Sequence, residues 1–253
     1  MEVITSVKNP LVAKIKKIKQ EPINTIFLDN PKTIEEAYLL GYKIDICLID
    51  IHSKDKILNN FNFLKNLNIT YVSSNVLASL SDVKTPQGIA CVIDLPKKNI
   101  SKPKSNFLVL ENLQDPGNLG TIIRSSRGTD FSDIYLINCV SPYNQKVVRS
   151  TMGALFTQNL YFFKNTQDFI NFAKANNLNL CAATMDGTNI YKFKQPTQNF
   201  GVVIGNEGNG ISKELIDFSQ YKVSIPMKNS LESLNAAVAC SIMIYYFDNI
   251  KNV

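Results

Sequence analysis

The chain has 253 residues, 45% of them hydrophobic and 19% charged, with a formal net charge of +6. This composition predicts a globular protein with a real hydrophobic core, and the length fits one large domain or two ordinary ones. No apolar run approaches the ~20 residues of a membrane-spanning helix, and the N-terminus lacks the apolar core of a signal peptide, so we expect a cytoplasmic protein.

The five cysteines and the single histidine, His52, are widely spaced along the chain. No two cysteines form a CxxC pair, which argues strongly against a zinc site. We therefore expect the cysteines to be small buried side chains in a reducing compartment, and we expect no metal.

The first predicted element is an amphipathic helix over residues 9–20. Its apolar side chains share one face, and lysines, among them Lys14 and Lys17, occupy the rest. A basic helix face is most often a solvated surface. The functional alternative is a helix that contacts phosphate groups.

Residues 25–94 alternate between predicted strands and helices. We expect strands at 25–29, 44–50, 69–73 and 89–94, and helices at 34–42 and 57–68. This alternation indicates an α/β unit with a mainly parallel sheet. A segment rich in proline and lysine follows, without apolar periodicity, and indicates a linker. We divide the chain into a first domain at 1–96, a linker at 97–106 and a second domain at 107–253.

The second domain repeats the α/β alternation. Its expected strands are 107–112, 134–138, 180–185, 201–206 and 222–227, and its expected helices are 117–128, 145–156, 166–177, 211–219 and 233–250. Polar residues or glycine follow three of these strands, near residues 112, 205 and 227. Because ligands of open α/β sheets bind outside the carboxyl ends of the strands, we expect the functional site there.

Arginine is rare in this chain. Only three of the 27 basic residues are arginine, namely Arg124, Arg127 and Arg149. In a composition that favours lysine, a retained arginine indicates a position that needs a planar, forked, permanently charged donor, although chance retention explains the pattern equally well on composition alone. We assign no role to Arg127 beyond that of a solvated surface residue.

The segment ENLQDPGNLGTIIR (111–124) follows one of the expected strands. Pro116 and Gly117 predict a turn, and Asn118 is a candidate N-cap for the next helix. Arg124 lies six residues further along, which is not the same helix face, so the two side chains need not point together. A capped helix with a surface arginine is the plain alternative.

The segment GVVIGNEGNGIS (201–212) places three glycines within six residues, which permits close backbone approach. It does not match the dinucleotide pattern G-x-G-x-x-G, and Glu207 inside the loop would repel a pyrophosphate. A dinucleotide-dependent oxidoreductase is therefore disfavoured. A ligand with a positive or zwitterionic centre fits this loop better.

The third segment is VSIPMKNSLESLNAAVA (223–239). Pro226 ends the strand, Ser233 is a candidate N-cap for the last helix, and Asn235 falls in its first turn. A turn and cap explain Ser233 but not the joint presence of Glu232 and Asn235.

The order of these segments is more specific than any one of them. NxGxxxR, then IGNEGxGIS, then IPMxxxxESLNxxVA resembles the three motifs of the SpoU/TrmH family of S-adenosylmethionine-dependent RNA 2′-O-ribose methyltransferases. The resemblance implies a C-terminal SPOUT-type α/β domain with a trefoil knot and a parallel sheet. It also implies a smaller N-terminal α/β domain, similar to a ribosomal protein, that binds the RNA substrate.

By this resemblance the methyl donor is S-adenosylmethionine, and the positions that line its site are Gly205, Ile225, Met227 and Leu234. Arg124 matches the motif-one arginine, for which we favour bidentate phosphate binding and ribose alignment over proton abstraction, because guanidinium resists deprotonation. The other positions around the reacting ribose are Asn118, Glu207, Ser233 and Asn235. The resemblance suggests that Glu207 pairs with Arg124 or orients it.

The resemblance also bears on partners. It implies RNA contacts for Arg149, with Lys14 and Lys17 as further RNA-binding candidates, and a homodimer formed through the second domain. Ribosomal RNA is favoured over transfer RNA as substrate. Asp29–Asn30 departs from the family's usual pair after the first strand, which bears on RNA docking and not on the reaction. The alternative function is a non-catalytic RNA-binding protein that retains the fold.

Overall fold

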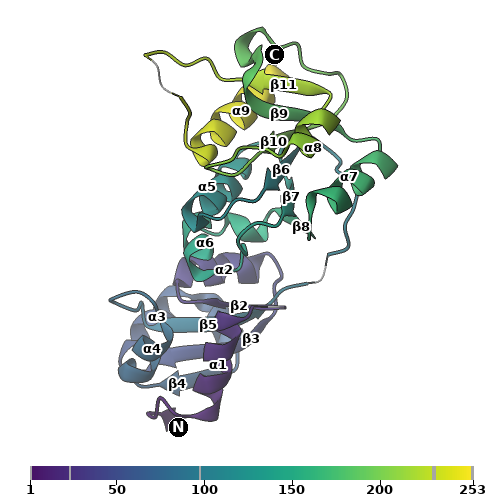
Figure 1. The fold of residues 1–253 in the computed structure, drawn as a ribbon. Coiled ribbons are helices and arrows are strands. Elements are labelled where there is room, and N and C mark those ends of the chain that lie inside the picture. Colours follow the sequence, from purple (N-terminus) through teal and green to yellow (C-terminus); the bar gives the residue numbers. More distant parts are fainter. Residues whose placement is uncertain (1, 23, 97, 230–231, 252–253) are drawn as a thin grey trace. The chain divides into compact units, whose positions relative to one another are not determined.

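The computed structural model describes residues 2–22, 24–96, 98–229 and 232–251. The chain forms two compact units (Figure 1). The first consists of Met1–Lys97 together with Tyr143–Gln145, and the second of Lys98–Pro142 and Lys146–Val253.

A five-stranded sheet forms the centre of the first unit, in the order β1-β4-β3-β5-β2. The strands are β1 (Val3–Ile4), β2 (Thr25–Leu28), β3 (Ile44–Asp50), β4 (Ile69–Val72) and β5 (Ile89–Asp94). β5 runs antiparallel to both of its neighbours, whereas β1, β4 and β3 are parallel. The sheet is thus mixed and not mainly parallel, because residue patterns predict strands but not their direction.

The helices of the first unit are α1 (Pro10–Gln20), α2 (Pro31–Leu39), α3 (Lys54–Asn60) and α4 (Ser74–Leu80). α1 starts where Asn9 caps it, and its buried Val12 and Ile15 join side chains of α4 over one face of the sheet. The single helix expected at 57–68 is wrong. The chain breaks at Phe61 (φ −130°), so that α3 is followed by a 3₁₀ turn at Asn62–Asn66. The sequence patterns also missed α4.

Six parallel strands form the sheet of the second unit, in the order β11-β9-β10-β6-β7-β8. The strands are β6 (Phe107–Glu111), β7 (Asp133–Ile137), β8 (Asn159–Phe163), β9 (Asn179–Asn189), β10 (Phe200–Ile204) and β11 (Tyr221–Ser224). β8 was not expected from the sequence. Since all six strands are parallel, their carboxyl ends lie along one edge of the sheet.

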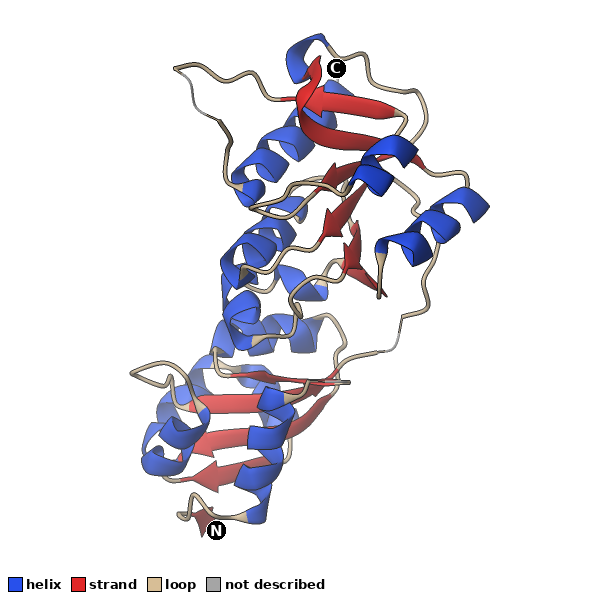
Figure 2. Ribbon diagram, viewed as in Figure 1, coloured by secondary structure: helices blue, strands red, loops and turns tan. Residues whose placement is uncertain are grey.

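Helices cover both faces of this sheet (Figure 2). They are α5 (Pro116–Ser126), α6 (Gln145–Thr151), α7 (Thr166–Ala175), α8 (Lys213–Phe218) and α9 (Ala236–Lys251). α5 packs against α9, and α7 and α8 cover the opposite face over a core built around Tyr135 and Phe169. The helix expected at 145–156 ends early, because Met152 and Gly153 adopt left-handed backbone angles.

All five cysteines are free thiols, and four of them are buried. Within the described part of the chain, no helix is both long and apolar enough to cross a bilayer. The same residues contain no cluster of three or more side chains able to hold a metal ion.

Candidate active site

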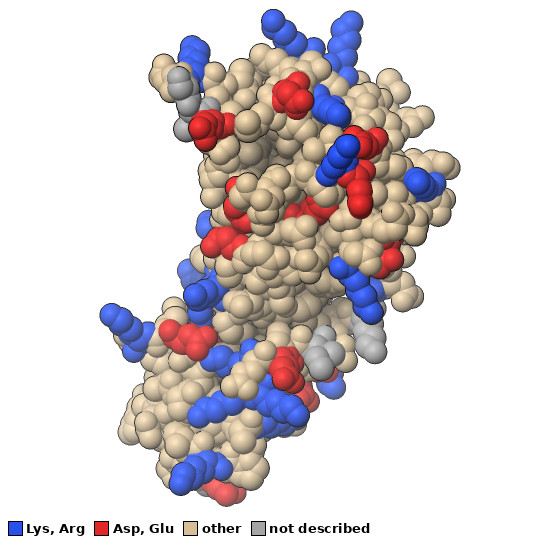
Figure 3. Space-filling model, in the orientation of Figure 1, with Lys and Arg blue, Asp and Glu red and all other residues tan. Residues whose placement is uncertain are grey.

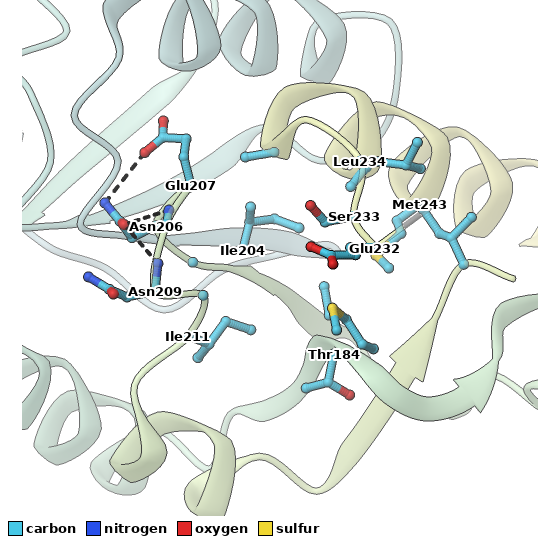
Figure 4. A pocket seen from close by; sticks show the side chains of 18 of the residues that line it. Thr184, Ile204, Asn206, Glu207, Asn209, Ile211, Glu232, Ser233, Leu234 and Met243 are labelled. Atoms are coloured by element: carbon cyan, nitrogen blue, oxygen red, sulfur yellow. Dashed lines mark hydrogen bonds between the residues drawn. The ribbon is translucent and has the colours of Figure 1, made fainter. Parts of the chain in front are cut away.

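A cavity of about 660 Å³ opens at the carboxyl edge of the second sheet (Figure 4). Four stretches of chain line it: the end of β10 with its glycine loop, the middle of β9, the segment after β11, and the start of α9. The lining residues are Ala183, Thr184, Met185, Ile204, Gly205, Asn206, Glu207, Gly208, Asn209, Gly210, Ile211, Ile225, Met227, Glu232, Ser233, Leu234, Ala236, Ala239 and Met243.

The glycine loop after β10 closes on itself. The backbones of Asn206 and Gly210 exchange two hydrogen bonds of 2.9 Å, and the Asn206 side chain accepts from the amides of Gly208 and Asn209. A Cβ on Gly205 would lie 2.1 Å from the Gly210 carbonyl carbon. Glycine is therefore required at 205 by the closure of the loop itself, before any ligand is considered.

A five-residue bulge in β9 forms another wall of the cavity. β9 and β11 pair as far as Ala182 and Lys222, and pairing then resumes at Thr188 and Val223. Residues 183–187 are the extra segment. Ser224 holds its far end by donating a 2.8 Å hydrogen bond to the Gly187 carbonyl. The bulge turns Thr184 and Met185 toward the cavity, and bulges commonly redirect side chains in this way beside active sites.

Three of the predicted site residues meet beside the cavity. The Asn235 side-chain amide donates to the Asn118 oxygen at 2.9 Å, and the Asn118 amide donates to a Glu207 carboxylate oxygen at 2.9 Å. Asn118 is only 8% exposed. This chain of hydrogen bonds joins the start of α5, the glycine loop and the start of α9, which are far apart in sequence. Because Glu207 also lines the cavity, the chain ends at the cavity's wall.

Both predicted helix caps are wrong, and the reason is the same. Asp115, not Asn118, caps α5 by accepting from the Asn118 amide at 2.8 Å. Asn235, not Ser233, caps α9 by accepting from the amides of Ala237 and Val238. Each helix has two neighbouring residues suited to capping, and sequence alone did not select between them. The shift leaves the Asn118 side chain available for the hydrogen bonds just described.

Glu111 is a part of the site to which the sequence analysis gave no role. It is fully buried at the end of β6, where its carboxylate accepts from the Ser212 amide at 2.7 Å and from the Ser212 hydroxyl at 2.8 Å. The Thr166 hydroxyl is a third donor. Three donors offset the cost of burying the charge, and they tie the end of the glycine loop to the first motif. The sequence does contain a feature that could have identified Glu111, namely an acidic residue at the end of an otherwise apolar strand.

Asparagine side chains link the ends of three neighbouring strands. Asn138, after β7, donates to the Asn112 side chain at 2.7 Å, and Asn206, after β10, donates to the Asn112 carbonyl at 2.8 Å. Asn112 and Asn138 both have positive φ angles, which asparagine tolerates better than most residues. The carboxyl edge of the sheet is therefore held rigidly beside the cavity.

Arg124 lies apart from these residues within one chain. It is exposed on α5, it does not line the cavity, and in the part of the chain that the structure describes its guanidinium makes no hydrogen bond or ion pair. Glu207 and Arg124 do not pair within one chain, because six residues along a helix carry Arg124 to a different face from Asn118. Ser233 lines the cavity but is not part of the Asn235–Asn118–Glu207 chain.

The predicted RNA-binding residues fall into two groups. Lysine side chains gather over α1 in Figure 3; Lys14 there pairs with Asp45 at 3.6 Å, and Lys17 is exposed. Arg149 is half-buried on α6 in the second unit. Because Lys14 already has an anionic neighbour, Lys16 and Lys17 are better placed than Lys14 to meet a phosphate.

The cavity suits S-adenosylmethionine in size and chemistry. Its volume lies within the range of small-molecule sites, about 300–1,000 Å³. Apolar walls for a flat ring come from Ile204, Ile225, Leu234 and Met243, and carboxylates that favour a sulfonium cation come from Glu207 and Glu232. The four residues expected to line a donor site, Gly205, Ile225, Met227 and Leu234, all line this cavity.

A model of the SpoU rRNA methylase family matches residues 105–245, which is more than half of the chain. The chain belongs to the SpoU rRNA methylase family. It is therefore an RNA methyltransferase, as the order of the three motifs predicted.

Two relatives of this SpoU methylase align over almost their whole length. It is 29% identical to an uncharacterized tRNA/rRNA methyltransferase of Synechocystis, over 96% of this chain and 92% of the relative. It is 26% identical to the 23S rRNA (guanosine(2553)-2′-O)-methyltransferase RlmP of Bacillus subtilis, over 97% of this chain and 99% of the relative.

Solved structures share the fold of this SpoU methylase. An AdoMet-bound rRNA methyltransferase from Sinorhizobium meliloti matches 97% of this chain and 96% of its own, with a TM-score of 0.83 at 24% identity. The SpoU methyltransferase AviRb from Streptomyces viridochromogenes, in complex with AdoMet, matches 95% and 98% with a TM-score of 0.83 at 21% identity. These likenesses confirm the expected α/β fold with its parallel sheet.

Proposed function

We propose that this chain transfers the methyl group of S-adenosylmethionine to a ribose 2′-hydroxyl of ribosomal RNA. One observation carries the proposal: the hydrogen-bonded chain Asn235–Asn118–Glu207 ends at the wall of a cavity sized for the donor. The Bacillus subtilis relative, named as a 23S rRNA 2′-O-methyltransferase, supports the choice of hydroxyl and RNA.

The donor would lie against Gly205, Ile225, Met227 and Leu234, and it supplies an activated methyl group on a sulfonium sulfur. The closed glycine loop presents backbone groups to the adenosyl part. The residues after β11 provide a dry, apolar surface that excludes water from the reacting centre. We further propose that these loops belong to a trefoil knot, which the family resemblance supports.

A ribose hydroxyl is a weak nucleophile and must be aligned and lose its proton as it attacks. The Asn118 amide is held by one hydrogen bond on its oxygen and one on its nitrogen, and each atom retains capacity for a further bond to a ribose hydroxyl. Glu207 is the only titratable side chain of the three, and its carboxylate can accept a proton. Ser233, at the cavity wall, would contact the ribose from the donor side.

Arg124 would bind the phosphate next to the reacting ribose. Its guanidinium presents parallel donors that match two phosphate oxygens, which a lysine ammonium cannot reproduce. Such a contact aligns the hydroxyl without taking its proton. Arg149 and the lysines of α1 would supply further phosphate contacts, which strengthen binding without choosing the sequence. The first unit would thus serve as the RNA-binding domain.

A homodimer formed through α5 and α9 would bring Arg124 to the reaction centre. Val238 and Tyr245 are 47% and 44% exposed on the α9 face that also carries Ser241, which hydrogen-bonds Ser125 of α5. Thr121 and Arg124 are exposed on the adjoining face of α5. Pairing of two copies over this surface would bury the apolar side chains and place Arg124 between the chains.

The Arg124 assignment is tested by incubating the protein with methyl-labelled S-adenosylmethionine and total RNA. We expect label in RNA, and we expect Arg124→Lys to lower kcat at least about a hundredfold, because the forked contact is lost, while donor affinity stays within about twofold. Arg127→Lys, at the neighbouring arginine, is the matched control and should keep full turnover. Full turnover by Arg124→Lys would contradict the role given to the fork.

The alternative is a non-catalytic RNA-binding protein that retains the same fold. Under either function we propose that the protein acts in the cytoplasm. It predicts RNA binding without donor binding. Calorimetry that detects no binding of S-adenosylmethionine to the full chain would favour this alternative over methyl transfer.

A further inference from the structure

A second cavity, of about 210 Å³, lies at the same edge of the sheet as the donor cavity. The ends of β7 and β8 and the loop after β7 form it, with Asn138, Cys139 and Phe162 among the lining residues. Its volume is below the range of about 300–1,000 Å³ for drug-sized ligands, and it suits a single flat ring. No step of the proposed reaction uses this cavity.

Phe162 presents an aromatic ring at the second cavity. It lies on β8, the edge strand of the sheet, and is 48% exposed, whereas its neighbours Tyr161 and Phe163 are 5% and 9% exposed. RNA-binding proteins stack unpaired bases on aromatic side chains that are held in this way at a surface. The ring and the cavity together therefore suit a base better than they suit an aliphatic ligand.

The surroundings of the ring supply the other contacts that a nucleotide needs. The Asn138 side-chain nitrogen donates to Asn112 at 2.7 Å, and the Asn138 side-chain oxygen keeps the capacity to accept from the edge of a base. Lys164 follows β8 directly and is exposed, so it offers a cation to a phosphate. A stacking ring, an acceptor and a cation thus lie within one short stretch of the sheet edge.

Hydrogen bonds join the second cavity to the reaction centre. Asn112 accepts from Asn138, at the second cavity, and from Asn206, at the donor cavity. β10, β6, β7 and β8 are consecutive strands of the sheet (Figure 1). Because neighbouring strands are about 4.8 Å apart, the ends of β7 and β8 lie roughly 10–15 Å from the end of β10. The nucleotides next to a reacting ribose can reach across this distance.

We propose that the second cavity binds an unpaired base of the RNA substrate, stacked on Phe162, next to the nucleotide whose ribose is methylated. This inference rests on the proposed function, which sets the reacting ribose beside Asn118 and Glu207. The stacked base and the phosphate held by Lys164 fix the strand on one side of the ribose. The enzyme therefore selects RNA in which the bases around the target are unpaired.

The kinetic test uses the full chain and ribosomal RNA purified from cells that lack this protein. Phe162→Ala should raise the KM for RNA about tenfold, because stacking is lost, and leave kcat at saturating RNA within about threefold. Phe162→Tyr keeps the aromatic face and should stay within about threefold of the original KM. Donor affinity, measured by calorimetry, should not change, since Phe162 does not line the donor cavity.

Tyr191→Ala is the matched control. Tyr191 is also an exposed aromatic residue of the second unit, at 58%, but it follows β9 on the other side of the sheet. This variant should keep the original KM for RNA. Lys164→Gln should lower the slope of RNA affinity against salt concentration by about 1 on a double-logarithmic plot, because one phosphate contact is lost.

Crosslinking gives a readout that depends neither on activity nor on a variant. The full chain and the same RNA are irradiated with ultraviolet light and digested, and the peptides are examined by mass spectrometry. We expect a nucleotide attached to a peptide that contains Phe162 or Cys139. Peptides from this cavity that carry no nucleotide would overturn the inference.

An unchanged KM for Phe162→Ala would also overturn it, and so would a KM for Phe162→Tyr that rises as far as that of Phe162→Ala. If Phe162→Ala sediments as a smaller species than the original, the cavity belongs to a contact between subunits and the inference is wrong. Failure of the unmodified protein to methylate ribosomal RNA would instead refute the proposed function, and a crosslink at Phe162 would still support the base site. The two failures are therefore distinguishable.

Discussion

A single residue, Gly205, allows the glycine loop that lines the cavity to close. Because its missing Cβ makes room for the Gly210 backbone, we expect Gly205→Ala to open the loop and to weaken donor binding by at least about tenfold. Gly208→Ala is the matched control. A Cβ there would meet nothing in the chain closer than 3.5 Å, so Gly208→Ala should leave the loop closed and the melting temperature unchanged, whereas Gly205→Ala should melt lower. Calorimetry on both variants checks this, and normal affinity of Gly205→Ala would refute the steric argument.

For individual residues, the sequence identified some members of the site and missed others. The motifs identified Asn118, Glu207 and Asn235 as members of one site, and the structure joins them by hydrogen bonds. The sequence did not reveal that Asp115 would cap α5, or that Thr184 would be among the residues that line the cavity. Both depend on backbone placement to within one residue, which local patterns do not fix.

Among the secondary-structure elements, the helices α5 and α9 together form the surface proposed for dimer formation. We expect Tyr245→Asp combined with Val238→Asp to convert a dimer into a monomer, because each carboxylate would be desolvated in the pairing surface. Methyl transfer should fall with the dimer, since Arg124 lies on the adjoining face of α5. Leu39→Asp, at a residue 75% exposed on the first unit, is the control and should leave the dimer intact.

Sedimentation at micromolar concentration measures this outcome. A protein that sediments as a monomer before any substitution would contradict the dimer, and so would a monomeric double variant with full turnover.

Element prediction succeeded where apolar periodicity was long and unbroken. α1 and α7 lie where their patterns placed them, because each has one apolar face and a clear cap. It failed at 57–68, where apolar spacing suited one helix but the backbone of Phe61 (φ −130°, ψ 89°) leaves the helical region. It also missed the bulge in β9, because a bulge depends on the partner strand and leaves no periodic signal.

At the scale of the whole molecule, the sequence indicated an α/β protein with a catalytic sheet at its C-terminal side, and the family match and solved structures agree. The strand order β11-β9-β10-β6-β7-β8 was not predictable from periodicity. Strand order arises from packing between distant segments, whereas periodicity reports only which face of each segment is buried.

The order of the three motifs predicted the family, whereas no single loop did so. Each loop taken alone has a plain structural explanation as a turn or a cap. The three meet at one sheet edge because parallel strands bring their carboxyl ends together, and that meeting creates a donor-sized cavity beside an aligned polar chain.

The most direct test of methyl transfer to a ribose is to digest the methylated RNA to nucleosides and to identify the labelled product by mass spectrometry. We predict a 2′-O-methylnucleoside as the labelled product. We also predict that Asn118→Ala abolishes this product while still binding S-adenosylmethionine, because Asn118 aligns the hydroxyl and does not line the donor cavity. Label on a nucleobase, or full product from Asn118→Ala, would contradict the account.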